Sequence, residues 1–338
     1  MKKITSFIAS LLIVAAFTVG IISCKKDNPT NDSGNGVSSE VYVAGSGRNT
    51  DGIYVATIWQ NGIAKNLSSV VSIAFSVYVS GNDVYVVGDE QSQNDDGSVY
   101  DVATIWKNGV ATKLSTSYSS ARSVYVSGED VYVAGNEDNV ATVWKNGVAT
   151  KLSTSQSSAR SVYVFGNDVY VAGNEDGTNA TVWKNGVATK LSASNSIAHS
   201  VYVSENNVYV SGYERKEGKT IATVWKNGVM TALTDGTKMA VAVSVYVSGN
   251  DVYAAGIEIE YDPENDSEKD MATLWKNGVK TTLSSSYSEA NSVCVSDGNV
   301  YVAGYDEDEN DGEVVLWKNG VATVLPSGGD AYSVFVKK

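Results

Sequence analysis

Apolar and polar residues alternate in short runs along the chain from residue 40 onward, and no stretch of that region shows the period of a helix. In "DVYAAG" (251–256), for example, Val252 and Ala254 would face one side of a strand and Tyr253 the other. Alternation with a period of two, bounded by Gly, Asn or Asp, is typical of β-strands. Small apolar residues alternate mostly with aromatic ones, so we expect both faces of these strands to be buried. The pattern predicts an all-β protein.

The predicted strands belong to a unit that repeats about every 43 residues. Self-similarity at this period indicates a solenoid or a propeller. Each unit contains four short strands, which we call a ("SVYVSG"), b ("DVYVAG"), c ("ATVWKNG") and d ("VATKLS"), and Asn-Gly between c and d is a strong hairpin signal. The motif Trp-Lys-Asn-Gly, once Trp-Gln-Asn-Gly, contains every tryptophan of the chain: Trp59, Trp106, Trp144, Trp183, Trp225, Trp275 and Trp317.

The two ends of the repeat region complement each other. The region opens at "EVYVAG" (40–45), a strand b with no strand a before it, and closes at "SVFV" (333–336), a strand a with nothing after it. A solenoid would instead carry atypical polar caps at both ends. We therefore expect a seven-bladed β-propeller of four-stranded antiparallel blades, closed by pairing of the C-terminal strand with the N-terminal blade.

The repeats, "VYVAG" followed later by "WKNG", resemble those of bacterial propeller proteins over residues 40–336. They are weakly similar to kelch blades, but they lack the paired glycines of kelch and the Trp-Asp ending of WD40 repeats. The resemblance implies the propeller fold and its general use as a binding platform. It implies no functional residue.

The N-terminal region has the features of an export signal. A basic start and the apolar run "FIASLLIVAAFTVGII" lead to "IISC", which resembles a bacterial lipobox and predicts lipidation of Cys24. We expect a lipoprotein signal peptide at 1–23, a flexible tether at 24–38 and the propeller at 39–338; a plain signal peptide is the alternative. Lys25, where a retention signal of the inner membrane would carry Asp, favours the outer membrane by resemblance.

Charge and cysteine content narrow the classes of partner. The formal net charge is −13, and removal of residues 1–23 with their two lysines would leave −15. So acidic a domain would repel phosphate backbones, which argues against nucleic acid as a partner. Cys294 stands where sister repeats carry Tyr, and we interpret it as a buried substitution rather than a reactive thiol.

Sequence variation is expected to fall on one rim of the propeller. Because strands alternate in direction, the uniform a–b and c–d turns share one rim, and the variable d–a and b–c loops share the other. The b–c loops are long and acidic, as in "YDPENDSEKD" (261–270) and "YDEDENDGE" (305–313). Calcium binding there is one hypothesis, but solvated hairpin tips explain the composition equally, and we predict neither a metal site nor a cofactor.

A second variable position precedes each strand a, in the motif Ala-x-Ser. Because strand a is the innermost strand of a blade, we expect x to surround the mouth of the central channel, where a concave ring of mixed side chains would bind a ligand. Neutral variation at an exposed strand start is the alternative. The candidate ligand-binding residues are these x positions and those four residues earlier: Phe75, Tyr118, Arg122, Gln156, Arg160, Asn195, His199, Tyr287, Asn291 and Tyr332.

These features favour a non-catalytic binding module anchored in the cell envelope. Its ligand would be a glycan, a peptide or a protein, and Arg122, Arg160 and His199 favour an acidic group. A scaffold of an envelope complex is the first alternative. A hydrolase or lyase is the second, although His199 is the only histidine and no nucleophile elbow, zinc spacing or phosphate loop is present in the sequence.

Overall fold

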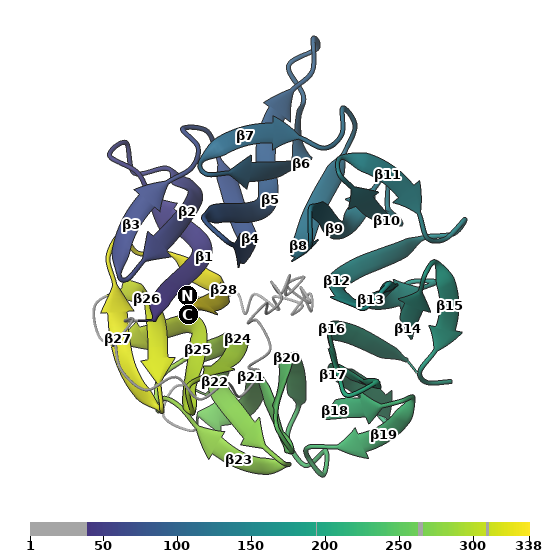
Figure 1. Cartoon of the computed structure of the whole chain (residues 1–338). Coiled ribbons are helices and arrows are strands. Elements are labelled where there is room, and N and C mark those ends of the chain that lie inside the picture. Colours follow the sequence, from purple (N-terminus) through teal and green to yellow (C-terminus); the bar gives the residue numbers. More distant parts are fainter. Residues whose placement is uncertain (1–38, 194, 263–265, 309–310) are drawn as a thin grey trace, which may run out of the picture.

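The computed structural model describes residues 39–193, 195–262, 266–308 and 311–338, and these form seven four-stranded antiparallel sheets around one axis (Figure 1). The predicted seven-bladed propeller is therefore confirmed. Blade 1 contains β28, β1, β2 and β3, and blades 2 to 7 each take the next four strands in order. The described residues include no helix of the length and apolarity that a membrane span requires.

The four strands of a blade run from the axis outward in the order a, b, c, d (Figure 1). Starting from blade 1, strand a is β28 (Asp330–Lys337), β4 (Ser72–Ser80), β8 (Ser119–Ser127), β12 (Ser157–Phe165), β16 (Ser196–Ser204), β20 (Ala240–Ser248) and β24 (Ser288–Ser296). Strand b is β1 (Glu40–Arg48), β5 (Asp83–Gln93), β9 (Asp130–Glu137), β13 (Asp168–Glu175), β17 (Asn207–Lys216), β21 (Asp251–Asp262) and β25 (Asn299–Asp308). Strand c is β2 (Tyr54–Gln60), β6 (Val99–Lys107), β10 (Val140–Lys145), β14 (Asn179–Lys184), β18 (Lys219–Lys226), β22 (Ser267–Lys276) and β26 (Asp311–Lys318). Strand d is β3 (Ile63–Asn66), β7 (Val110–Lys113), β11 (Val148–Lys151), β15 (Val187–Lys190), β19 (Val229–Ala232), β23 (Val279–Thr282) and β27 (Val321–Leu325).

The ring closes as the ends of the repeat region predict. Strand β28 pairs antiparallel with β1, with Phe335 opposite Tyr42 and Val334 opposite Val43. The last strand of the chain thereby supplies the inner strand of the first blade, so that β1 is paired on both sides.

A ring of hydrogen bonds joins each blade to the next. The serine of every Ala-x-Ser motif accepts a hydrogen bond from the backbone N–H of a valine in the following blade, at 2.8–3.3 Å. The serine is constant because this buried N–H needs a partner. In order around the ring, the pairs are Ser333 with Val77, Ser76 with Val124, Ser123 with Val162, Ser161 with Val201, Ser200 with Val245, Ser244 with Val293 and Ser292 with Val334.

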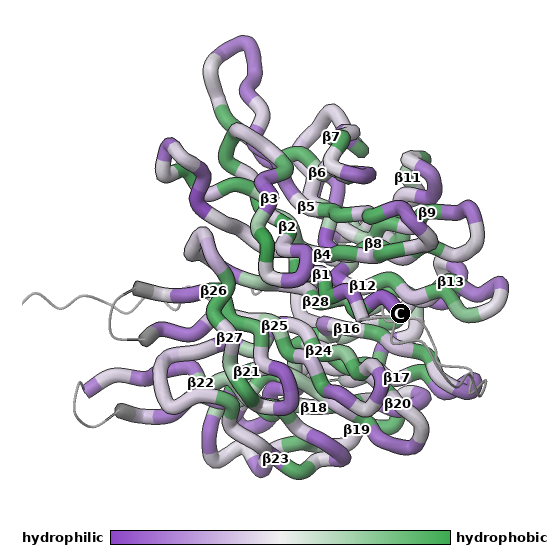
Figure 2. Tube along the Cα trace, turned by 60° about the vertical axis from the view of Figure 1, so that its left-hand side comes forward, coloured by the Kyte–Doolittle hydropathy of each residue, from purple (hydrophilic) through white to green (hydrophobic). Residues whose placement is uncertain are grey.

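The core lies between the blades. All seven tryptophans of strand c are at most 1% exposed, and the aromatic residues of strand a contact their neighbours around the axis with ring centroids 4.7–5.2 Å apart. Cys294 takes the seventh place in that aromatic series and is buried, as the sequence predicts. Figure 2 shows hydrophobic residues along the strands and hydrophilic ones at the hairpin tips.

The uniform rim is built from one repeated hairpin. In each Lys-Asn-Gly turn (Gln-Asn-Gly in blade 1) the Asn and Gly both have positive φ, 50–54° and 80–86°, which a two-residue hairpin of this kind requires. The Asn Oδ1 also accepts a hydrogen bond from the backbone N–H of a residue in strand b of the same blade, at 2.8–2.9 Å. The sequence of the hairpin is uniform because the turn requires its Asn and Gly, and because the Asn side chain also bonds strand b.

Candidate functional site

The variable x position occupies a β-bulge in all seven blades. The pairing of strand a with strand b skips one residue between the Ala and the Ser of each Ala-x-Ser motif, and x is that residue. The motif therefore lies inside strand a, whereas from the sequence we expected it at the entry to that strand. A bulge turns its extra side chain away from the regular alternation, so x can vary without disturbing either face of the sheet.

The bulge also explains the glycine of "VYVAG". A Cβ at this glycine would lie 1.8–1.9 Å from the backbone carbonyl oxygen of the residue two before x. No side chain fits in that space, so only glycine can pair with the bulged strand. The position is occupied by Gly45, Gly88, Gly135, Gly173, Gly212, Gly256 and Gly304.

Most of the x side chains are more enclosed than residues at an open mouth would be. Phe75, His199 and Asn291 are 2–4% exposed, whereas Arg122 and Tyr332 are half-buried. Adjacent members of the series touch one another: the ring centroids of Phe75 and Tyr332 are 5.3 Å apart, and the Arg122 Cζ lies 4.1 Å from the Phe75 centroid. Ligand binding by these residues stays a prediction.

The three basic members of the series lie in blades 3, 4 and 5. Arg122 approaches Asp89, with 3.6 Å between Nη2 and Oδ2, so its charge is partly offset. Burial, and then the charge of Arg122, lower the pKa of Arg160 to about 10. Burial and Arg160 together lower the pKa of His199 well below its usual value, so this imidazole is neutral at neutral pH. Within the described residues, neither ring nitrogen of His199 has a hydrogen-bond partner.

The candidates four residues earlier have a shared backbone role. At these positions, including Val71, the carbonyl oxygen accepts a hydrogen bond from the N–H of a residue in or beyond strand b of the same blade, at 2.7–3.0 Å. Their side chains are left to vary: Tyr118 is 51% exposed, Gln156 and Asn195 are exposed, and Tyr287 is half-buried. Tyr287 alone of the predicted residues lines the cavity described next.

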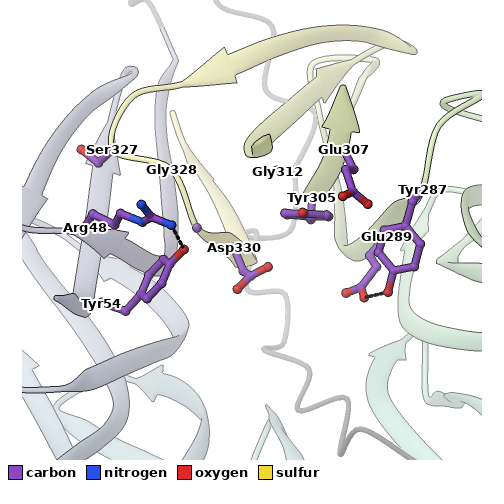
Figure 3. Close-up of a pocket in the computed structure, with 11 residues that line it drawn as sticks. Arg48, Tyr54, Tyr287, Glu289, Tyr305, Glu307, Gly312, Ser327, Gly328 and Asp330 are labelled. Carbon is purple, nitrogen blue, oxygen red and sulfur yellow. Dashed lines mark hydrogen bonds between the residues drawn. The ribbon is translucent and has the colours of Figure 1, made fainter. Parts of the chain in front are cut away.

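A cavity of about 750 Å³ opens on the variable rim between blades 7 and 1, where the ring closes (Figure 3). Blade 7 contributes Tyr287 from just before β24, Glu289 from β24, Tyr305 from β25 and Gly312 from β26. Blade 1 contributes residues of β1 and β2 together with the start of β28. On this side, the Arg48, Tyr54 and Asp330 side chains line the cavity (Figure 3).

Two carboxylates of this cavity replace uncharged residues of the other blades. The residue before each Ala-x-Ser motif is apolar or Ser in blades 2 to 6, namely Ile73, Ser120, Ser158, Ile197 and Val241. It is Glu289 in blade 7 and Asp330 in blade 1, and both are only partly exposed. Sequence reasoning missed this pair. The pair could have been found in the sequence as a departure from the repeat in blades 7 and 1. These two blades become neighbours only when the ring closes.

Burial raises the proton affinity of both carboxylates. Burial, and then the charges of Asp270 and Asp330, raise the pKa of Glu289 to about 7. Burial likewise raises the pKa of Asp330, against hydrogen bonds from Tyr332 and Ser46. A pKa near neutrality in a cavity is typical of functional sites.

Tyrosines shape the cavity. The Tyr287 hydroxyl lies 3.3 Å from both Glu289 Oε1 and Asp270 Oδ2. Its ring stands nearly perpendicular to that of Tyr305, at 78° with centroids 6.1 Å apart, so the two form an aromatic corner. On the opposite wall, Arg48 Nη2 donates a hydrogen bond to the Tyr54 hydroxyl at 2.9 Å (Figure 3).

Among the described residues, no three His, Cys, Asp or Glu side chains are grouped to hold a metal ion. Parts of the two acidic loops for which calcium was considered, residues 263–265 and 309–310, lie outside the described residues. The calcium hypothesis therefore stays untested.

Comparison with known proteins supports the fold. No protein-family model and no curated protein matches the sequence. The chain is similar to the β-propeller domain of the Trilobed protease from Pyrococcus furiosus, with 14% identity over 75% of this chain and 82% of that one and a TM-score of 0.46. It is similar to an acylaminoacyl peptidase from Pyrococcus horikoshii, with 15% identity, 89% of this chain covered and a TM-score of 0.50. This chain spans 52% of that peptidase, and at such identity the likeness shows the propeller fold alone.

Proposed function

We propose that the protein is a non-catalytic binding module of the cell envelope that takes up its ligand at the variable rim, mainly in the cavity between blades 7 and 1. The observation that carries the proposal is the departure from the repeat at this place. Glu289 and Asp330 introduce partly buried charge where sister blades have Ile, Val or Ser. Burying charge costs stability, so a repeat scaffold gains nothing structural from it.

The cavity suits one small group of a larger ligand. Its volume of about 750 Å³ lies within the usual range for ligand sites. Tyrosine faces, a guanidinium and carboxylates around one space would contact a single sugar residue or amino-acid side chain. The ligand classes remain those that the sequence suggests, a glycan, a peptide or a protein surface.

The envelope location is part of the proposal and rests on the sequence. A lipid on Cys24 would anchor the protein, and residues 25–38 would tether the propeller near the membrane, with the outer membrane favoured. The signal peptide, Cys24 and the tether lie outside the described residues. Metabolic labelling with a palmitate analogue, compared between wild type and Cys24→Ala, tests the anchor.

From the proposed site we predict that Tyr54→Ala weakens ligand binding at least about 10-fold. Tyrosines that line a pocket commonly contribute more than about 1.4 kcal/mol to the binding free energy. Tyr54 is 42% exposed, so its removal should leave the fold intact. A glycan and peptide array first identifies a ligand, and equilibrium binding then compares the variants.

The matched control is Tyr118→Ala, which removes a tyrosine of the same rim that is 51% exposed and lies outside the cavity. It should bind as wild type does. Loss of binding in Tyr118→Ala or Arg122→Ala, with Tyr54→Ala unaffected, would place the ligand at the channel mouth instead. If no variant of the rim alters binding, an assembly scaffold becomes the better proposal, and chemical change of the bound ligand would favour the hydrolase or lyase.

A further inference from the structure

We infer that the group bound between blades 7 and 1 is an organic ammonium ion, held against Glu289 and Asp330 in the corner formed by Tyr287 and Tyr305. The inference rests on the proposed binding function and adds the chemical class of the ligand. Four observations support it: the missing counter-cation, the aromatic corner, the placement of Arg48 and the proton affinity of Glu289.

Among the described residues, Glu289 and Asp330 have no cationic partner, whereas several other acids of the propeller do. On the uniform rim, lysines pair with aspartates of strand b at 2.7–2.8 Å. On the variable rim, Glu258 of blade 6 pairs with Lys280 at 2.6 Å. Among the described residues, no lysine or arginine forms an ion pair with Glu289 or Asp330. Two partly buried carboxylates that line one cavity are stabilised when a cation enters it.

The aromatic corner indicates an organic cation. Tyr287 and Tyr305 present perpendicular ring planes beside the carboxylates. Such faces attract ammonium groups through the ring quadrupole, most strongly where the ion is removed from water. Gly312 lies against Tyr305, and a Cβ at Gly312 would overlap the Tyr305 hydroxyl, so the glycine lets the ring keep this place. A bare metal ion would need oxygen ligands in these directions rather than ring carbons.

The opposite wall orients the ligand. The Arg48 guanidinium lies over the Tyr54 ring, 5.0 Å from its centroid, on the far side of the cavity from Glu289 (Figure 3). Its positive charge repels an ammonium group from that wall. The cation is therefore kept near the carboxylates and away from Arg48, and the rest of the ligand extends toward Arg48 and the open rim.

Binding should depend on pH through Glu289. The groups that face it are Asp270 on β22, Tyr287 just before β24, Tyr305 on β25, and Asp330 and Tyr332 on β28. With its pKa raised to about 7, Glu289 gains its negative charge as the pH rises through neutrality. At pH 5.5 only about 3% of the group would be ionised, so affinity for a permanent cation should be about 30-fold lower than at pH 8.5.

Calorimetric titration of the full chain in mild detergent tests the inference, with choline as the probe because its charge does not titrate. We expect choline and butylammonium to bind, and the uncharged tert-butyl isostere of choline to bind at least about 10-fold more weakly. Glu289→Gln should lose at least about 10-fold in choline affinity and lose the pH dependence. Glu175→Gln, an acid at the end of β13 outside the cavity, is the matched control and should behave as wild type.

Equal binding of choline and its isostere, or an unchanged pH dependence in Glu289→Gln, would overturn the inference. Should Glu289→Gln fail to fold by circular dichroism, Asp330→Asn carries the choline-affinity part of the test. Failure of the proposed function looks different: no member of the glycan, peptide and amine panel would then bind at a site sensitive to Tyr54→Ala. A Tyr54-dependent ligand without a cationic group would leave that function standing and refute the ammonium assignment alone.

Discussion

A chain that ends after Gly329 is expected to lose the cooperative unfolding of the propeller altogether. It lacks β28, whose Val334, Phe335 and Val336 are at most 3% exposed. Each such side chain contributes about 1.5–3 kcal/mol by burial. The truncation also removes the hydrogen bonds through Ser333 and Val334 that join blade 1 to blades 2 and 7. The sum exceeds about 5 kcal/mol, which is comparable with the whole stability of a typical domain.

Urea unfolding followed by near-UV circular dichroism measures this effect. The control removes Lys338 alone, an exposed residue whose pairing with Asp297 should contribute at most about 1 kcal/mol. A synthetic peptide of residues 330–338 should restore the folded signal by adding the missing strand to β1. A truncated chain that unfolds cooperatively at the wild-type urea concentration would refute the closure mechanism.

Gly173→Ala is expected to destabilise the propeller by about 3 kcal/mol, at the upper end for overpacking. The added Cβ would lie 1.8 Å from the Ser158 carbonyl oxygen, a backbone atom fixed by the bulge of β12. Relief requires the bulge to shift, and Ser161 beside it holds blade 5 through the N–H of Val201. Thermal and urea unfolding of purified protein provide the measurement.

Gly177→Ala is the matched control because it makes the same chemical change in the next turn. Gly177 has a φ of 77°, and a Cβ added there would have no atom within 4 Å. The substitution should therefore cost only about 1 kcal/mol of backbone strain. Equal losses in the two variants would mean that the bulge does not require glycine. The same comparison can be repeated in any blade, because all seven share the contact.

Much of the fold could be predicted because the same local signals recur in every unit. Asn-Gly marks each c–d hairpin, and the single strands at the two ends of the repeat imply closure of the ring. The repetition averages out the ambiguity of any one short strand. The strand boundaries were less predictable: strand a begins several residues before "SVYV", at Ser119 in blade 3 for example.

The bulge escaped prediction for a physical reason. One extra residue reverses the side-chain alternation, so Ala121 and Ser123 of blade 3, which flank it, do not follow the period of two that identifies the rest of the strand. A variable residue between two constant small ones therefore looks like the end of a loop. The constant glycine opposite, Gly135 in this blade, was the available clue, because a glycine inside a strand commonly marks a bulge.

The cavity escaped prediction because its walls are far apart in sequence. Tyr54 belongs to the first blade and Glu289 to the last, and they meet only because β28 returns to β1. Its acids also interrupt the repeat at a position that was treated as part of the constant strand. In a repeat protein, partly buried charge at an otherwise apolar or Ser position is the signal to follow.

We propose that blades 7 and 1 depart from the repeat at the expense of stability and in favour of binding. The pKa of Glu289 rises from 4.5 to about 7 on folding. Between pH 4.5 and pH 7, Glu289 is therefore mostly protonated in the folded state and mostly ionised in the unfolded chain. Stability contributed by the protonated form is therefore lost as the pH rises from about 4.5 to about 7.

Unfolding free energies of wild type and Glu289→Ser, measured from pH 4 to pH 8.5, test this claim most directly. Serine is the residue of blades 3 and 4 at this position. We predict that the variant matches wild type near pH 4, exceeds it by about 2 kcal/mol at pH 8 after allowance for partial exposure, and no longer binds choline. A variant less stable than wild type at pH 8 would make Glu289 a structural residue and contradict the claim.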